Sequence, residues 1–168
     1  MIEAIIENNE VIIKDRENGN KLYNDGYGIW CSNGLKLFPV EVLYLMEKEK
    51  ITVKDVNKKL LSFRDLLRRF ITVDKKIWIK YMIYNDLKKR GFWIKPGFSD
   101  NVEFLISEGG KSEIFNYIVI GLEEVIKLSF NDLMKMVNEA LRSNKELILA
   151  IVDKEGNISY YTVTRMMR

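Results

Sequence analysis

The side chains that could do chemistry in this chain are limited by the absence of histidine from its 168 residues. Imidazole is the usual group that takes up and releases protons near neutral pH, so this chain excludes serine–histidine and cysteine–histidine nucleophiles and histidine-bound metals. Its one cysteine, Cys31, cannot form an internal disulfide, and one thiol without histidine cannot build a structural zinc site. Catalysis would have to use carboxylates, tyrosine, lysine or arginine, and we expect no metal and no cofactor.

One loop is well placed to carry such side chains. The segment from Ile77 predicts a helix whose last turn, residues 88–90 (KKR), holds cations where the helix dipole favours them, with Gly91 at the C-terminal cap. A short strand over residues 92–95 should follow. The loop from Pro96 to Asn101 then interrupts regular structure, and we expect any active site to lie there.

Composition narrows the class of protein. The chain is 47% apolar and 30% charged, as in soluble globular proteins, and its net charge of +3 is too small to indicate nucleic-acid binding by itself. The basic turn at residues 88–90 could contact RNA, although solvated helix-end charges explain it at least as well.

No apolar run approaches the roughly 20 residues that span a bilayer. The N-terminal residues lack the basic region of a signal peptide, so we expect a cytoplasmic protein with no membrane contact.

The elements that would position a site fall into two groups, which predict domains 1–72 and 73–168. The first domain should be a small α+β unit. Its predicted elements are a β-hairpin (residues 2–6 and 11–14), a polar stretch (15–20), a turn region (26–34), a helix from Pro39, a strand (51–53) and a helix capped by Ser62 and Asp65. The fold class is therefore α/β (α+β).

The second domain should contain a mixed β-sheet flanked by helices. After the helix from Ile77 we expect strands over residues 92–95, 102–106 and 114–120, a helix capped by Ser129, and strands over 147–152 and 158–166. The helix should bury Phe130, Leu133, Met134, Val137 and Leu141 on one side.

Several segments also carry a recognisable motif. They are residues 35–45 (LKLFPVEVLYL), 61–66 (LSFRDL), 80–92 (KYMIYNDLKKRGF), and the closing pair 149–153 (LAIVD) and 159–161 (SYY). In this order and spacing they resemble the archaeal tRNA-splicing endonucleases, where the third segment reads K-Y-x-V-Y-x-D-L-R-x-R-G-[YF]. The resemblance covers nearly the whole chain and implies a nuclease-like C-terminal domain.

The resemblance also implies where catalytic groups belong. In that family a tyrosine, a histidine and a lysine are proposed to cleave RNA at bulge–helix–bulge junctions, leaving a 2′,3′-cyclic phosphate and a 5′-hydroxyl. Here Asp100 stands at the tyrosine position of the loop motif and Ile114 at the histidine position of the H-x-x-Y strand. Lys145 alone is retained. Ile114 cannot protonate a leaving oxygen, and a general acid typically contributes roughly 10² to 10⁴-fold, so we expect a non-catalytic chain.

Other family positions differ as well. Asn101 stands where the loop motif has glycine, and Glu103 where it has a buried aspartate. Asn138 and Asn144 stand where the family has arginines that would grip the RNA bulge.

Assembly is the function that the resemblance leaves open to this chain. Family members work as pseudo-tetramers, and in some archaea a catalytic and a structural chain form a pair that doubles into a heterotetramer. We expect an acidic loop at Glu123 and Glu124 to dock on a partner, and the last strand, with Tyr161, Val163 and Met166, to pair with another chain. Alternatively, Glu123 and Glu124 could be ordinary charged residues of a surface loop, and the last strand could be a plain core strand.

The main hypothesis is therefore a structural subunit that positions a catalytic tRNA-splicing endonuclease subunit on pre-tRNA. One alternative is a weak nuclease that uses Asp100 and Lys145. Another is a module that reuses the fold to bind a different RNA or protein through the basic turn at residues 88–90.

Overall fold

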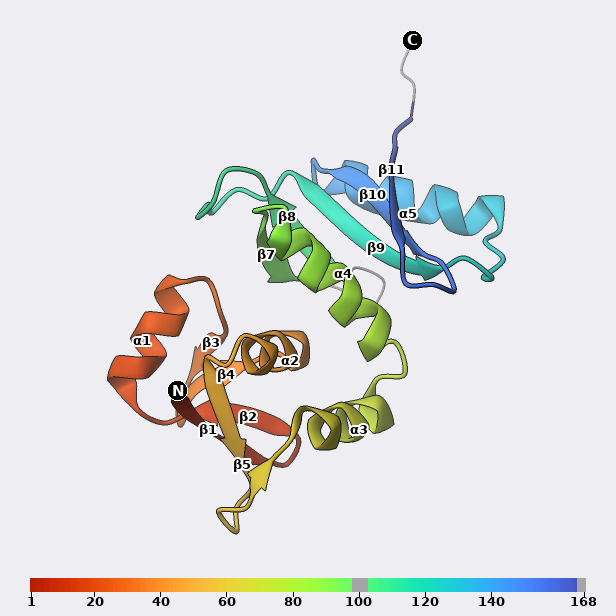
Figure 1. The fold of residues 1–168 in the computed structure, drawn as a ribbon. Helices are drawn as coiled ribbons and strands as arrows, with labels where there is room; N and C mark the ends of the chain where they lie inside the picture. Colours follow the sequence, from red (N-terminus) through yellow and green to blue (C-terminus); the bar gives the residue numbers. More distant parts are fainter. Residues whose placement is uncertain (98–102, 166–168) are drawn as a thin grey trace. The chain divides into compact units, whose positions relative to one another are not determined.

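A computed structural model describes residues 1–97 and 103–165 of the chain (Figure 1). The chain divides into two compact units, Met1–Tyr81 and Met82–Arg168. Each unit has its own mixed β-sheet together with helices, which confirms the predicted α+β class. No helix in the described part of the chain is long and apolar enough to cross a membrane.

The sheet of the first unit has the strand order β3-β4-β2-β1-β5-β6. Strands β1 and β5 run parallel, and the other neighbours run antiparallel. The predicted hairpin at the N-terminus is confirmed, with Ile5 opposite Ile12. The strands are β1 (Ile2–Glu7), β2 (Glu10–Ile13), β3 (Ile29–Cys31), β4 (Gly34–Leu37), β5 (Ile51–Lys54) and β6 (Leu60–Leu61).

The helices of the first unit are α1 (Arg16–Asn24), α2 (Pro39–Glu47) and α3 (Phe63–Val73). Helix α3 begins at the predicted capping box, in which the Ser62 hydroxyl accepts a hydrogen bond from the backbone N–H of Asp65. Helix α1 was not predicted, because the polar stretch that forms it buries only Gly19 and Leu22 and so carries no apolar stripe. The Asp15 carboxylate caps it by accepting from the N–H of Asn18 at 2.8 Å.

The sheet of the second unit has the order β11-β10-β9-β8-β7. Strands β9 and β10 run parallel and are joined by a helix, while the other neighbours run antiparallel. The predicted order of helix, three strands, helix and two strands is confirmed. These elements are α4 (Ile77–Lys89), β7 (Trp93–Pro96), β8 (Phe104–Ser107), β9 (Tyr117–Glu123), α5 (Phe130–Arg142), β10 (Glu146–Val152) and β11 (Ile158–Val163).

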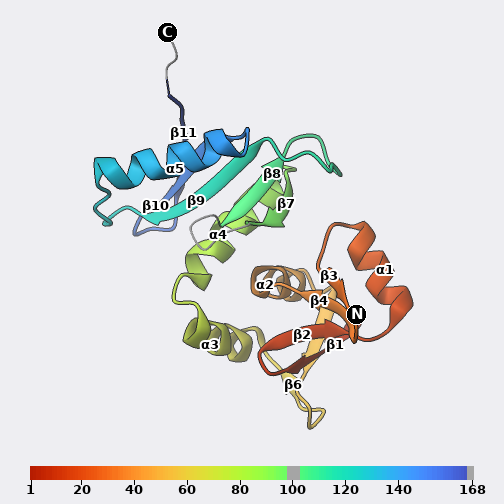
Figure 2. The same ribbon diagram turned by 180° about the vertical axis from the view of Figure 1, so that it is seen from behind.

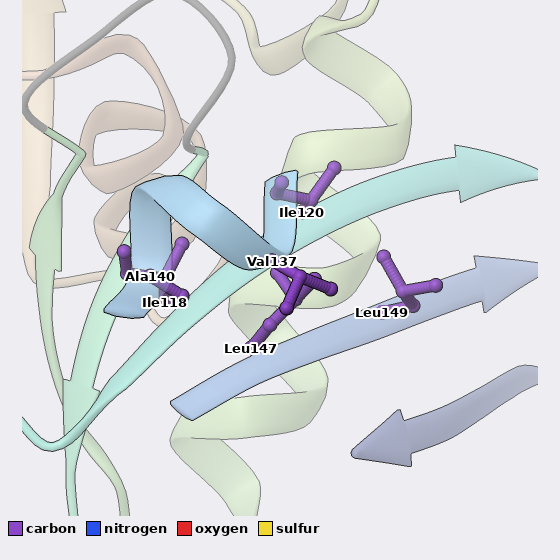
Figure 3. Packing of buried hydrophobic residues seen from close by; sticks show 6 residues of the cluster. All are labelled: Ile118, Ile120, Val137, Ala140, Leu147 and Leu149. Carbon is purple, nitrogen blue, oxygen red and sulfur yellow. The ribbon is translucent and has the colours of Figure 1, made fainter. Parts of the chain in front are cut away.

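Helix α5 covers one face of this sheet, and helix α4 lies on the other (Figures 1 and 2). Figure 3 shows the residues that α5 and the strands β9 and β10 bury between them: Ile118, Ile120, Val137, Ala140, Leu147 and Leu149. Side chains along a strand point alternately to the two faces of the sheet. Phe104 of β8 pairs with Val119, which lies between Ile118 and Ile120, so it points to the opposite face. There its ring centroid lies 5.7 Å from that of Tyr84 on α4.

The buried side of α5 differs from the prediction. Phe130 and Leu141, which were expected to face the core, are 74% and 48% exposed. Ala140 is buried instead, because the helix turns the positions of Val137 and Ala140 toward β9 and β10. The bulky side chains at the two ends of α5 therefore remain outside the core.

Candidate functional site

Lys145 lies between the end of α5 and the start of β10. Its backbone N–H donates to the carbonyl of Ala140, and Asn144 before it turns the chain with a φ of 54°. Its side chain is half-buried, and Nζ donates a hydrogen bond of 2.6 Å to the carbonyl of Phe115. The fold thus brings the retained lysine beside the residue that follows Ile114.

Lys145 lines a cavity of about 480 Å³. It lies where β9 and β10 begin and where α5 and β11 end, and Tyr117, Asn144, Lys145 and Glu146 are among the polar side chains that line it. The negative charge of Glu108, with smaller contributions from burial and Glu146, raises the pKa of the Tyr117 phenol. That phenol therefore stays protonated at neutral pH and is a poor base.

Ile114 lies outside the strand that was predicted to begin with it. Strand β9 starts at Tyr117, and Ile114 is 72% exposed in an irregular segment, where its N–H donates to the Ser112 hydroxyl. The prediction of a strand over residues 114–120 is therefore wrong at its start, because the segment before Tyr117 has no strand partner in β8 or β10. A hydrocarbon side chain at this position can transfer no proton.

The loop expected to hold the first catalytic group is framed by Gly97 and Glu103. Asp100 itself, with Asn101, lies outside the described residues. Glu103 is 7% exposed, and its backbone joins both sides of the loop: its N–H donates to Val119 and its carbonyl accepts from Gly97. The Glu103 carboxylate accepts a 2.7 Å hydrogen bond from the N–H of Gly121. This anchor ties the end of the loop to β9.

The two asparagines at the family's arginine positions lie on and just after α5. Asn138 is half-buried, and Asn144 is exposed at the wall of the cavity. Neither carries a charge, so neither can supply the cation that the resemblance places there.

The basic turn at residues 88–90 is largely engaged within its own unit. The ammonium of Lys88 lies 5.7 Å from the ring centroids of both Tyr84 and Trp93. Arg90 donates to Asp86 at 2.7 Å and lies 5.0 Å from the Tyr160 ring. These contacts favour a structural role for the turn over RNA contact.

The predicted docking features lie at the other end of β9 and along β11. Glu123 is the last residue of β9, and the N–H of Glu124 donates to the carbonyl of Val152; both side chains are exposed. Sequence reasoning missed that Val125 and Ile126 beside them are also exposed, at 64% and 47%. The exposed surface at the end of β9 therefore combines two carboxylates with two apolar side chains, and the pattern EEVI marks all four in the sequence.

Strand β11 forms one edge of the second sheet, with β10 as its neighbour. Tyr161 is 54% exposed, whereas Val163 packs against the core beneath α5. Met166 lies outside the described residues. The edge of β11 away from β10 is the side on which another strand could add.

Within residues 1–97 and 103–165, no group of three or more acidic or cysteine side chains lies close enough together to hold a metal ion. The candidate site consists of Lys145, the cavity that it lines, and the segment from Ile114 to Phe115 that its ammonium contacts.

Comparison with known proteins identifies the family. The model for the tRNA intron endonuclease N-terminal domain matches residues 2–67, and the model for the tRNA intron endonuclease catalytic C-terminal domain matches residues 77–160. A tRNA-splicing endonuclease of Methanococcus maripaludis is 35% identical over 164 residues, which cover 96% of this chain and 93% of that protein. A tRNA-splicing endonuclease of Thermococcus kodakarensis is 32% identical over 97% of both chains. An EndA-like protein of Methanopyrus kandleri is 28% identical over 158 residues. With both domains matched and the similarity running along nearly its full length, this chain belongs to the tRNA intron endonuclease family.

Proposed function

We propose that this chain is a structural, non-cleaving subunit of a cytoplasmic tRNA-splicing endonuclease. It assembles with a catalytic chain of the same family into a heterodimer that doubles to a heterotetramer, and the complex recognises bulge–helix–bulge introns in pre-tRNA. The partner makes the cut and leaves a 2′,3′-cyclic phosphate and a 5′-hydroxyl.

The observation that carries this proposal is the missing proton donor. The whole chain lacks histidine, and the position that the resemblance gives to it is occupied by the exposed hydrocarbon Ile114. Tyr117, a phenol that lines the cavity, has a raised pKa, which makes it a weaker proton donor than an ordinary tyrosine. Loss of a general acid alone removes roughly 10² to 10⁴-fold in rate.

Lys145 has a structural task that explains its retention without catalysis. Its ammonium holds the carbonyl of Phe115 and so fixes the chain just before β9.

Two surfaces support the assembly. The acidic loop at Glu123 and Glu124, with its exposed apolar neighbours, suits a basic groove on a partner, and the edge strand β11 suits strand pairing. Replacing both glutamates by lysine should weaken the complex. Glu7→Lys/Glu49→Lys, which changes two exposed glutamates of the first unit, is the control for the same change in net charge.

The test is to purify the chain alone and together with a family member that has tyrosine, histidine and lysine at the catalytic positions. A synthetic bulge–helix–bulge RNA is the substrate. We expect a stable complex that cuts the RNA and an isolated chain that does not. Robust cleavage by the isolated chain, or failure of the two chains to co-purify, would overturn the proposal.

A second candidate is a chain that assembles with copies of itself and cuts RNA. It is favoured by the full-length similarity to relatives named tRNA-splicing endonuclease. In this case Asp100 and Lys145 would have to do the chemistry. The double variant Asp100→Ala/Lys145→Ala in the assembled enzyme separates the two functions, since a structural subunit should leave cleavage nearly intact. A large loss of cleavage, with the complex preserved, favours the second candidate.

A further inference from the structure

The first unit contains a second polar cavity, far in sequence from the elements of the candidate site. Its volume is about 540 Å³, within the range of small-molecule sites. It is lined by the end of β2, the start of α1 and the turn between β3 and β4. The lining residues that matter for its chemistry are Lys14, Arg16, Asn20, Trp30, Cys31 and Asn33.

Trp30 provides an aromatic surface in this cavity. It lies on β3, the edge strand of the first sheet, and is 39% exposed. Its ring fits closely against α1, because a β-carbon on Gly19 would lie only 2.7 Å from Cη2 of Trp30. Glycine destabilises the middle of a helix, so its presence in α1 is explained by the space that the Trp30 ring needs. The ring of Tyr23, with its centroid 6.4 Å away, supports Trp30 from the same helix.

The charge of the cavity is positive. Lys14 and Arg16 both line it, and none of the described residues that line it is acidic. Asp15 lies between them in the sequence, but its carboxylate is directed to the N–H of Asn18. Lys36 and Lys54, on the same sheet, form ion pairs with Glu10 and Glu3. Among the described residues of the first unit, Lys14 and Arg16 have no such carboxylate partner.

An exposed aromatic ring beside two uncompensated cations is the combination with which proteins bind single-stranded nucleic acid. Bases of any kind stack on the ring, and the cations meet the phosphates. We propose that this cavity binds one nucleotide of a single-stranded RNA segment. The base stacks on Trp30, the phosphate lies between Lys14 and Arg16, and the amides of Asn20 and Asn33 hydrogen-bond to the base or ribose.

The choice of RNA as the source of the nucleotide rests on the tRNA intron endonuclease family to which the chain belongs. The recognition itself requires no cut and no partner chain. The first unit would thus hold a single-stranded part of the RNA, while cleavage takes place at another site.

Binding is tested on the full-length chain with a fluorescein-labelled octauridylate, measured by fluorescence anisotropy at several salt concentrations. Trp30→Ala should weaken binding by about 5- to 150-fold, the range for losing one stacked base. Lys14→Glu/Arg16→Glu should weaken it and reduce the slope of log K against log salt by about 0.7, the value for one phosphate contact. Unlabelled UMP as competitor separates a free nucleotide from an RNA strand: UMP that binds as tightly as the octamer overturns RNA as the source.

Control variants lie on the same unit. Trp78→Ala removes another exposed tryptophan, and Arg64→Glu/Arg69→Glu reverses two exposed cations on α3. Both should bind the octamer as the unaltered chain does. If they weaken binding as much as the cavity variants do, binding is unspecific and the proposal fails.

The single cysteine gives a readout that needs no substitution and so does not depend on the folding of a variant. Cys31 is exposed and lines the cavity. Saturating octauridylate should slow its modification by a maleimide at least several-fold, while an uncharged polymer of similar size should not. An unchanged rate of modification with bound RNA would overturn the proposed place of binding. Because neither measurement uses a partner chain or RNA cleavage, failure here is distinguishable from failure of the proposed structural-subunit function.

Discussion

Glu103 offers a direct test of how the second unit holds the loop before β8. Its buried carboxylate accepts a hydrogen bond of 2.7 Å from the N–H of Gly121, while its backbone N–H and carbonyl bond Val119 and Gly97. The variant Glu103→Gln keeps the size and one acceptor oxygen of the side chain. It removes the negative charge and places an amide NH₂ where a carboxylate oxygen was.

The expected loss follows from these contacts. A hydrogen bond to a charged group stabilises a fold by about 1.5–3 kcal/mol, and a neutral one by about 0.5–1.5 kcal/mol. Exchanging one for the other should lower the free energy of unfolding by about 1–2 kcal/mol. For a unit of this size, each kcal/mol lowers Tm by about 4–8 °C. Glu103→Ala, which leaves the Gly121 N–H without this acceptor, should cost more than Glu103→Gln.

Urea unfolding followed by circular dichroism measures this loss. Glu108→Gln is the matched control, because Glu108 lies in the exposed turn that follows β8. Its substitution should change the free energy of unfolding by less than about 0.5 kcal/mol. If Glu103→Gln proved as stable as Glu108→Gln, the carboxylate would not anchor the loop, and the reasoning would be refuted.

Three further predictions concern the closing hairpin. The hydrogen bond from the backbone N–H of Asn157, followed by that from its side chain, holds the pKa of Asp153 below its usual range. A carboxyl group with a lowered pKa stabilises the fold at pH values above its ordinary pKa of 3.8, and this stabilisation is lost as the pH falls through the pKa of the folded state. Asp153→Asn should therefore lower the free energy of unfolding at pH 6 by more than at pH 2, as measured by urea titration. Tyr160→Phe removes a 2.6 Å hydrogen bond to Asp86 and should cost about 1–2 kcal/mol, whereas Tyr161→Phe, at an exposed neighbour, should be nearly neutral by the same titration. Tyr161→Lys should leave thermal unfolding of the isolated chain unchanged but weaken its complex in size-exclusion chromatography with light scattering; an intact complex would exclude pairing through this edge.

Much of the fold could be predicted because local signals and tertiary packing agree. Pro39 starts α2, the pair Ser62 and Asp65 starts α3, and Ser129 starts α5, as capping rules require. Helix α1 could not be predicted, since its stability comes from the Asp15 cap and from contact with Trp30 rather than from an apolar stripe.

The candidate site could be predicted only in part. The sequence resemblance identified Lys145, but its bond to the carbonyl of Phe115 depends on the approach of α5 to the start of β9, which no local pattern encodes. The exposure of Ile114 was missed for a related reason. An apolar run of this length predicts a strand, yet a strand also needs neighbours, and those of β9 begin only at Tyr117.

The parallel pairing of β9 with β10 has a consequence for the order of folding. A tight turn joins the strands of the β10–β11 hairpin, so their contacts are local. The parallel pairing of β9 with β10 instead needs the crossover that contains α5 and brings together residues farther apart in the chain. Strand β11 reaches the rest of its sheet through β10 alone. Because contacts between distant residues form more slowly than local ones, we expect the edge proposed to receive a partner to join the sheet after the β10–β11 hairpin has closed.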